Sequence, residues 1–161
     1  MKTLISILFL QICIEGYSQC DIKTNHIPDG VTMKYFTPKP VAKTKNHEAG
    51  LSLYYNVNTN QYTLSIFVLL KNTIKSELSG NLIIQTTNHA GISLTPHIHK
   101  MVKMNGNDVA TSVYYLSDRD IIELKTYTLK TLAFDMNGEI IGLTTTENKN
   151  LLINEFKCLN N

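Results

Sequence analysis

Tryptophan is absent from this chain of 161 residues, and arginine occurs once, as Arg119. Charged residues make up 17% of the chain, and the net charge is only +2 at neutral pH. Proteins that bind nucleic acid usually carry a basic patch that contains arginines, whose paired N–H groups donate hydrogen bonds to bases or phosphates. The composition therefore excludes a strongly basic nucleic-acid binder. Any aromatic platform for a ligand has to be built from tyrosines.

The nearest approach to a basic patch is a stretch interrupted by Pro38 and Pro40. It holds four lysines: Lys34, Lys39, Lys43 and Lys45. Charge runs of this kind usually keep a loop hydrated. We therefore interpret the stretch as a solvated loop, with one short strand over residues 31–36.

Motifs for catalysis or cofactor binding are also missing. The sequence has no nucleophile elbow, phosphate-binding loop or dinucleotide fingerprint, and residues 77–81 lack the first glycine of the elbow. Asp118 and Asp120 flank Arg119 where a helix is expected to begin, and acidic residues there complement the helix dipole. The sequence thus favours a non-catalytic protein, and no cofactor is predicted.

Residues 1–18 have the layout of a secretory signal peptide. A lysine follows the first methionine, an apolar run covers residues 4–14, and Gly16 and Ser18 place small residues before a cut at Gln19. The run is about half of the roughly 20 residues that a membrane span needs. No other segment is long and apolar enough to span. We expect an exported, soluble protein, secreted or periplasmic, with no transmembrane segment in the mature chain.

Two of the three cysteines remain after removal of residues 1–18, namely Cys20 and Cys158. Two lone cysteines in an oxidising compartment tend to pair, and the termini of a domain often lie close together. We therefore expect a disulfide between Cys20 and Cys158. The alternative is lipid attachment at Cys20, but Gln19 before it departs from the usual lipoprotein pattern.

Residues 19–161 have the commonest size of a single domain, and their alternating pattern predicts a β-rich fold. A first hairpin is expected around a loop at residues 58–61, with a central second strand because residues 67–70 are apolar on both faces. Its register pairs apolar residues throughout: Val57 with Tyr62, Tyr55 with Leu64, Leu53 with Ile66, and Leu51 with Val68.

Two Asn-Gly pairs, at residues 105–106 and 137–138, predict tight hairpin turns because both positions favour positive φ. Pro96 limits the strand before the first of them to a sheet edge or a bulge. Further strands are expected at residues 82–84 and 92–94. In the first hairpin, the predicted pairs on an apolar face are Val102 with Val109 and Ile98 with Val113, and those on a polar face are His99 with Ser112 and His97 with Tyr114. In the second hairpin, the predicted pairs are Phe134 with Ile141 and Leu132 with Leu143.

Two helices complete the prediction. Ser117 and Asp120 imitate a capping box before an apolar segment. A last helix is expected to be capped by a threonine at residues 144–146 and to bury a stripe of Leu152, Phe156 and Leu159. The expected fold class is α+β: a mainly antiparallel sheet or sandwich built from hairpins, with two short helices, the last at the C-terminus.

Residues 116–159 combine a Leu-Ser-Asp-Arg-Asp helix start, the run Leu-Lys-Thr-Tyr-Thr-Leu-Lys-Thr-Leu-Ala-Phe, an Asn-Gly turn and a helix ending in Lys-Cys-Leu. With the Tyr-Ser-Gln end of the signal segment, they resemble small, uncharacterised exported proteins of Bacteroidota. The resemblance implies a cell-envelope or secreted setting and carries no function.

His97 and His99 are the best candidates for metal ligands, because residues two apart on a strand point to the same side. A catalytic zinc needs three protein ligands and a structural zinc needs four. No spacing selects the next ligand from the remaining candidates: His26, His47, His89, Asp108, Asp118 and Asp120. We therefore rank solvent-exposed histidines above a metal site.

Paired tyrosines at residues 54–55 and 114–115, with Tyr62, are candidates for an aromatic patch that faces a ligand. Tyr54 and Tyr114 are the candidate binding residues. In the alternative interpretation, one tyrosine of each pair belongs to the core and the other reaches the surface.

The leading functional hypothesis is an exported, non-catalytic β-rich module that binds a protein, a glycan or an envelope component. One alternative is a metal-binding protein or hydrolase that uses His97 and His99. Another is a structural envelope protein. A long unpaired edge strand or a large exposed apolar patch favours the binding module.

Overall fold

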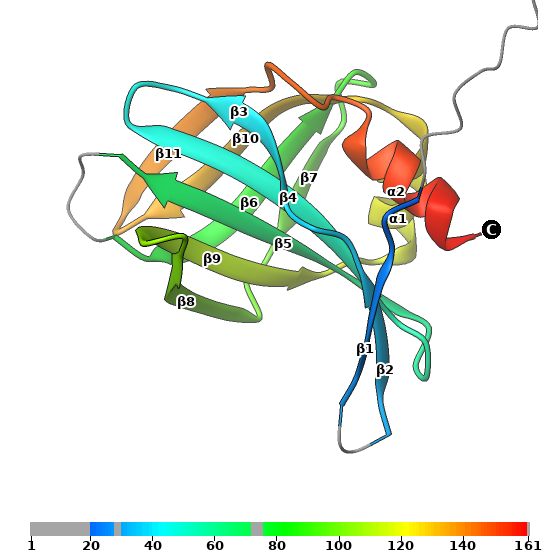
Figure 1. The fold of residues 1–161 in the computed structure, drawn as a ribbon. Coiled ribbons are helices and arrows are strands. Elements are labelled where there is room, and N and C mark those ends of the chain that lie inside the picture. The colour runs from blue at the N-terminus through cyan, green and yellow to red at the C-terminus, as the bar shows by residue number, and fades with distance from the viewer. Residues whose placement is uncertain (1–19, 28–29, 72–75, 161) are drawn as a thin grey trace, which may run out of the picture.

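The computed structural model describes residues 20–27, 30–71 and 76–160, so the predicted signal peptide lies outside the described residues. Within this part, strands form two antiparallel sheets, and two helices lie together at one end of the molecule (Figure 1). The predicted α+β, mainly antiparallel class is confirmed, with the second helix at the C-terminal end. No helix in these residues is long and apolar enough to cross a membrane.

The larger sheet, sheet A, has seven strands in the described residues. Its path is β1-β2-β4-β5-β9-β8, and β3 pairs with β4 on the same edge as β2. β5 lies between β4 and β9, so its predicted central position is confirmed. The bounds are β1 Lys23–His26, β2 Thr32–Tyr35, β3 Lys39–Lys43, β4 His47–Asn56, β5 Gln61–Leu70, β8 Ile98–Met104 and β9 Asn107–Tyr115.

The smaller sheet, sheet B, has the order β11-β10-β6-β7 and lies behind β4 and β5 in Figure 1. Its strands are β6 Leu78–Thr86, β7 Gly91–Leu94, β10 Leu129–Met136 and β11 Glu139–Thr144. Helix α1, Asp118–Thr126, connects the two sheets, and helix α2, Leu151–Leu159, follows β11.

One hydrophobic core joins both sheets and both helices. On sheet A, alternate residues of β4, β5 and β9 point inward, as the alternation of the sequence requires. The fully buried side chains of this core include Leu51, Leu53, Leu64, Ile66, Val68 and Tyr114 from sheet A, Leu82, Ile84 and Leu132 from sheet B, and Leu124 from α1. The predicted stripe of α2 contributes Leu152 and Phe156, each 1% exposed, with Leu159 packed partly against them.

The β4–β5 hairpin keeps its predicted inward face but not its predicted register. Leu53 pairs with Leu64, whereas the prediction paired Leu53 with Ile66. The loop covers residues 57–60, and Asn60 within it takes a positive φ of 56°. The prediction was wrong because a shift by two residues leaves every side chain on its original face, so alternation alone does not distinguish the two registers.

The two Asn-Gly hairpins have the predicted registers. Ile98 pairs with Val113 in the first, and Phe134 pairs with Ile141 in the second. The asparagines of the two turns take positive φ values of 50° and 53°. Strands are also present where residues 31–36, 82–84 and 92–94 were expected to form them.

The predicted polar face of the β8–β9 hairpin is not wholly exposed to solvent. Ser112 and Tyr114 on that face are 0% exposed, because it points into the core. The apolar face points outward instead, and Ile98 on it is 51% exposed. This reversal places an apolar surface on the outside of sheet A.

Part of the stretch interpreted as a solvated loop is strand β3, so that interpretation was wrong. Val41 and Ala42 are fully buried, while Lys39 and Lys43 at the ends of the strand are exposed. The ladder with β4 shifts register between Pro40 and Ala42. Such a bulge accommodates a proline, which has no N–H to donate.

Helix α1 begins as predicted. The backbone N–H of Asp120 donates to the Ser117 hydroxyl, and the N–H of Ser117 donates to the Asp120 carboxylate. Helix α2 begins later than predicted, because its N-cap is Asn150. Of the predicted cap residues, Thr144 is the last residue of β11, and the N–H of Thr146 donates to the Val41 carbonyl.

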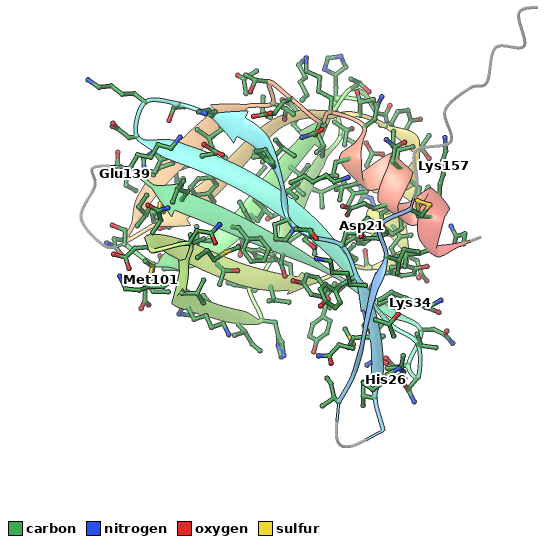
Figure 2. The ribbon with its side chains drawn as sticks, in the orientation of Figure 1. Asp21, His26, Lys34, Met101, Glu139 and Lys157 are labelled. Atoms are coloured by element: carbon green, nitrogen blue, oxygen red, sulfur yellow. A yellow bond between two sulfur atoms is a disulfide. The ribbon has the colours of Figure 1, made fainter. Side chains whose placement is uncertain are left out.

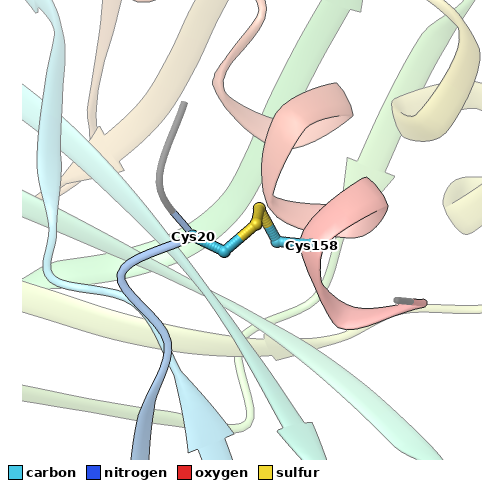
Figure 3. Close-up of a disulfide and its surroundings, with 2 residues drawn as sticks. All are labelled: Cys20 and Cys158. Carbon is cyan, nitrogen blue, oxygen red and sulfur yellow. A yellow bond between two sulfur atoms is a disulfide. The ribbon is translucent and has the colours of Figure 1, made fainter. Parts of the chain in front are cut away.

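Cys20 and Cys158 form the predicted disulfide, with Cα atoms 5.6 Å apart (Figure 3). The bond joins the segment before β1 to the last turn of α2. It therefore fixes α2 to the N-terminal end of the described chain.

Candidate functional site

Sheet A has a second face, the outer face, which points away from the core. Side chains from neighbouring strands stand next to each other on it, because Ile98 of β8 pairs with Val113 of β9, and Val113 pairs with Ser65 of β5. The row they form crosses three strands. The outer face is therefore a continuous surface built from residues far apart in the sequence.

A groove of about 400 Å³, the outer groove, is hollowed into this face. Short hydroxyl side chains on the two inner strands form its floor, where Ser65 is 3% and Thr111 is 6% exposed. Larger side chains surround these short ones and enclose the space above them. The apolar walls are Met33, Tyr54, Phe67, Ile98, Val102 and Val113.

Tyr54, one of the two predicted binding residues, lines the outer groove. Its ring stacks on that of Tyr35, with centroids 5.6 Å apart and planes within 9° of parallel. Burial raises the pKa of the Tyr54 hydroxyl above its ordinary value. The phenol therefore stays neutral at physiological pH.

Tyr114, the other predicted binding residue, does not reach the groove. It is fully buried in the core, and among the described residues its hydroxyl has no hydrogen-bond partner. Its neighbour Tyr115 is 51% exposed. The alternative interpretation, one buried and one exposed tyrosine, is therefore the correct one for this pair.

A smaller hollow of about 240 Å³ adjoins the outer groove and shares Phe67 with it. Leu69, Met104 and Val109 line this hollow, so the apolar character continues along the outer face. The exposed apolar surface is thus larger than the groove alone.

Strand β8 forms both a wall of the outer groove and an edge of sheet A. It ends the strand path, and in the described part of the chain no strand pairs with the side of β8 that faces away from β9. Ile98, Lys100 and Val102 of β8 line the groove. Main-chain hydrogen-bonding groups of an edge therefore lie beside an apolar surface.

His97 and His99 have different neighbours. The Nε2 atom of His97 lies 3.1 Å from the Tyr115 hydroxyl, and the two rings are in contact. His99 is exposed and lies 4.0 Å from the Glu77 carboxylate. Within the described residues, no cluster of three His, Cys, Asp or Glu side chains is arranged to hold a metal ion.

Comparisons with protein-family models, with curated proteins and with solved structures find no match for this chain. The geometry of the outer face and the chemistry of its side chains are therefore the basis for assigning a function.

The sequence contained part of the signal for the outer groove. The apolar alternation of Ile98, Val102, Val109 and Val113 was visible, but alternation does not say which face of a strand is inward. The contributions of Met33 and Phe67 depend on strand pairings across the whole sheet. No local sequence pattern predicts those strand pairings.

Proposed function

We propose that this protein is an exported, non-catalytic binding module that holds an extended apolar segment of a partner protein at the outer groove. The observation that carries the proposal is that β8 is at once a sheet edge and a wall of an apolar groove. An extended peptide beside β8 pairs its main chain with this edge and places alternate side chains on the outer face.

The apolar nature of the partner follows from the groove lining. Ile98 is 51% and Met104 is 38% exposed, and both lie on the same strand. A large contiguous apolar surface that is exposed to water commonly marks a site where a partner binds and covers it. The short hydroxyl floor at Ser65 and Thr111 leaves room for inserted side chains.

The charges on β8 favour an acidic partner strand over a second copy of this chain. Lys100 lines the groove, whereas Lys103, three positions further along the same strand, is ion-paired with Asp108 of β9 at 3.4 Å. Lysines on an edge strand oppose pairing with an identical strand. A carboxylate on the partner would instead complement Lys100.

Export is supported by the signal-like residues 1–18 and by the Cys20–Cys158 disulfide. Disulfides of this kind persist in oxidising compartments. A binding module in such a compartment meets secreted and envelope proteins.

The test is selection of peptides from a random library displayed on phage, using purified, disulfide-bonded protein. We expect the enriched peptides to alternate apolar residues and to carry acidic ones. Ile98→Glu should lower the affinity for a selected peptide by at least about tenfold, because it places a charge in the groove. Ile140→Glu is the matched control, since Ile140 is 72% exposed on sheet B.

Selected peptides that bind the Ile98→Glu variant as well as the parent would overturn the proposal. So would groove-dependent binding of glycans on an array or of phosphatidylglycerol vesicles in place of peptides. Equal loss in both isoleucine variants would count against it as well, because the effect would then be one of charge alone.

A further inference from the structure

A second cavity, of about 360 Å³, lies beside the disulfide and away from the outer groove. The segment before β1, the connection from β2 to β3, and the start of α2 enclose it; Figure 2 shows Asp21 of the first segment beside α2. Unlike the outer groove, this cavity is lined by several polar side chains. They include Asp21, Lys39, Lys149, Asn150, Asn154 and Glu155.

Glu155 is the unusual member of this set, because it is a carboxylic acid only 3% exposed. Its Oε2 atom accepts a hydrogen bond of 3.0 Å from the backbone N–H of Leu53. Its Oε1 atom is buried and has no hydrogen-bond partner among the described residues. Buried polar atoms normally have a hydrogen-bond partner, so the unpartnered Oε1 atom indicates a place where a ligand could bind.

The protonation state of Glu155 decides what kind of ligand fits. Burial raises the pKa of this carboxyl to about 8, although the hydrogen bond from Leu53 and the charge of Lys39 both lower it. The carboxyl is therefore mainly protonated at neutral pH. Since Oε2 already accepts from Leu53, the proton belongs on Oε1, which then acts as a donor without an acceptor.

The start of α2 adds further donors. The first turn of a helix leaves backbone N–H groups without partners inside the helix, and Asn150 makes no side-chain bond that caps them. The N–H of Leu151 donates to the Asn148 carbonyl, so the donors that remain in this turn are those of residues 152 and 153. No acidic residue occupies this turn. Lys39 and Lys149 add two positive charges to the lining, and Asp21 adds one negative charge.

We propose that this cavity binds a small oxyanion group, the carboxylate or phosphate of an organic ligand, between the start of α2, the two lysines and Glu155. An oxyanion accepts hydrogen bonds and carries negative charge, so it complements the donor on Glu155 and the two lysines, which outnumber Asp21 in the lining. Positive charge and N–H donors at a helix start together favour such a ligand. The site is independent of the outer groove and of its proposed partner.

Several charged or titratable groups act on Glu155. Lys39 of β3 and Tyr54 of β4 interact with it electrostatically. Asp21 and Lys149 share its cavity, and Lys125 of α1 lies over the ring of the adjacent Phe156. Glu155 is the only one of these with a pKa raised to about 8 that also presents a buried orphan atom.

The test is titration of the disulfide-bonded protein with sodium sulfate and, separately, with sodium acetate, followed by amide NMR shifts. We expect saturable shifts at residues 152 and 153 and at Leu53. Sulfate should bind better if phosphate is the natural group, and acetate should bind better if the natural group is a carboxylate. Lys149→Gln should weaken binding several-fold. Lys157→Gln is the matched control, because it removes the same charge from the other end of α2.

Raising the pH from about 6 to about 9 should weaken sulfate binding, because Glu155 then loses the proton that it donates. Glu155→Gln keeps an N–H donor and should remove this pH dependence while retaining binding. Absence of saturable shifts with both anions would overturn the proposal. Equal weakening by the two lysine variants would also overturn it, because binding would then be a matter of net charge.

Discussion

Glu155 of α2 and Leu53 of β4 are 102 positions apart in the sequence and are joined by a hydrogen bond of 3.0 Å. Among the described strands, none accepts the N–H of Leu53 on the side away from β5, because β2 pairs with β4 from Tyr54 onward and β3 pairs with it up to Leu51. The carboxyl of Glu155 fills this gap between β2 and β3. The contact therefore couples the protonation of one side chain to the attachment of α2 to sheet A.

The stability of the protein should fall as the pH rises from about 4.5 to about 8. Glu155 has its ordinary pKa near 4.5 in the unfolded chain and about 8 in the folded one, so the folded state binds the extra proton in this window. Unfolding free energy then decreases by at most about 1.4 kcal/mol per pH unit. Above the folded pKa, the contribution of this group no longer changes.

Urea unfolding at about pH 5 and about pH 8 measures this effect. Glu155→Gln should flatten the pH dependence, and the variant should be the more stable protein at the higher pH. Glu139→Gln is a suitable control, because Glu139 is exposed in the β10–β11 hairpin (Figure 2). A parent protein that is equally stable at both pH values, or a variant that keeps the parent's slope, would contradict the prediction.

Loss of the disulfide should destabilise the protein by about 2–5 kcal/mol, because the bond closes nearly the whole described chain. Cys158→Ser should therefore lower the urea midpoint, while the registers of the three hairpins remain. Parent protein unfolded under reducing conditions should match the variant. Thiol labelling of native protein should find neither Cys20 nor Cys158 free, and two reactive thiols would contradict the bond.

The hairpin turns show where local chemistry suffices for prediction. Asn105-Gly106 takes positive φ at both positions, and this requirement fixes one loop length and hence one register. The β4–β5 loop has no such pair. Its register instead depends on Asn60 adopting positive φ and on the side chain of Asn56 accepting backbone N–H groups at residues 58 and 59.

The two candidate sites were harder to predict, because both depend on long-range pairing. The apolar face of β8–β9 points outward only because Ser112 and Tyr114 on its other face enter the core. In the sequence, Glu155 looks like an ordinary solvent-exposed glutamate on a helix. Its burial requires the open N–H of Leu53, which exists only after β2 and β3 have both paired with β4.

Replacement of both His97 and His99 by alanine should change the unfolding free energy by no more than about 0.5 kcal/mol, as at other exposed positions. His97 contacts Tyr115 and His99 lies near Glu77, so the two rings have separate neighbours. Calorimetric titration of the parent with zinc should show no stoichiometric binding. Tight binding that the double variant loses would restore the metal-site hypothesis.

The mature protein should begin at Gln19, because Gly16 and Ser18 present small residues to a signal peptidase. The intact mass of the exported form measures this cut. The disulfide uses the sulfur of Cys20, which is the atom that a lipid anchor would occupy. A mass that includes a diacylglyceryl group on Cys20 would therefore contradict both the cut and the disulfide.

Substitutions on the two faces of sheet A should destabilise the protein to very different extents. Ile98→Ala should cost little, because Ile98 is 51% exposed on the outer face. Ile66→Ala should cost about 2–5 kcal/mol, because Ile66 is 0% exposed in the core and leaves a cavity behind. Unfolding in urea compares the two variants directly. A large cost at Ile98 with a small one at Ile66 would show that the apolar face of β8–β9 points inward, and the outer groove would then not exist.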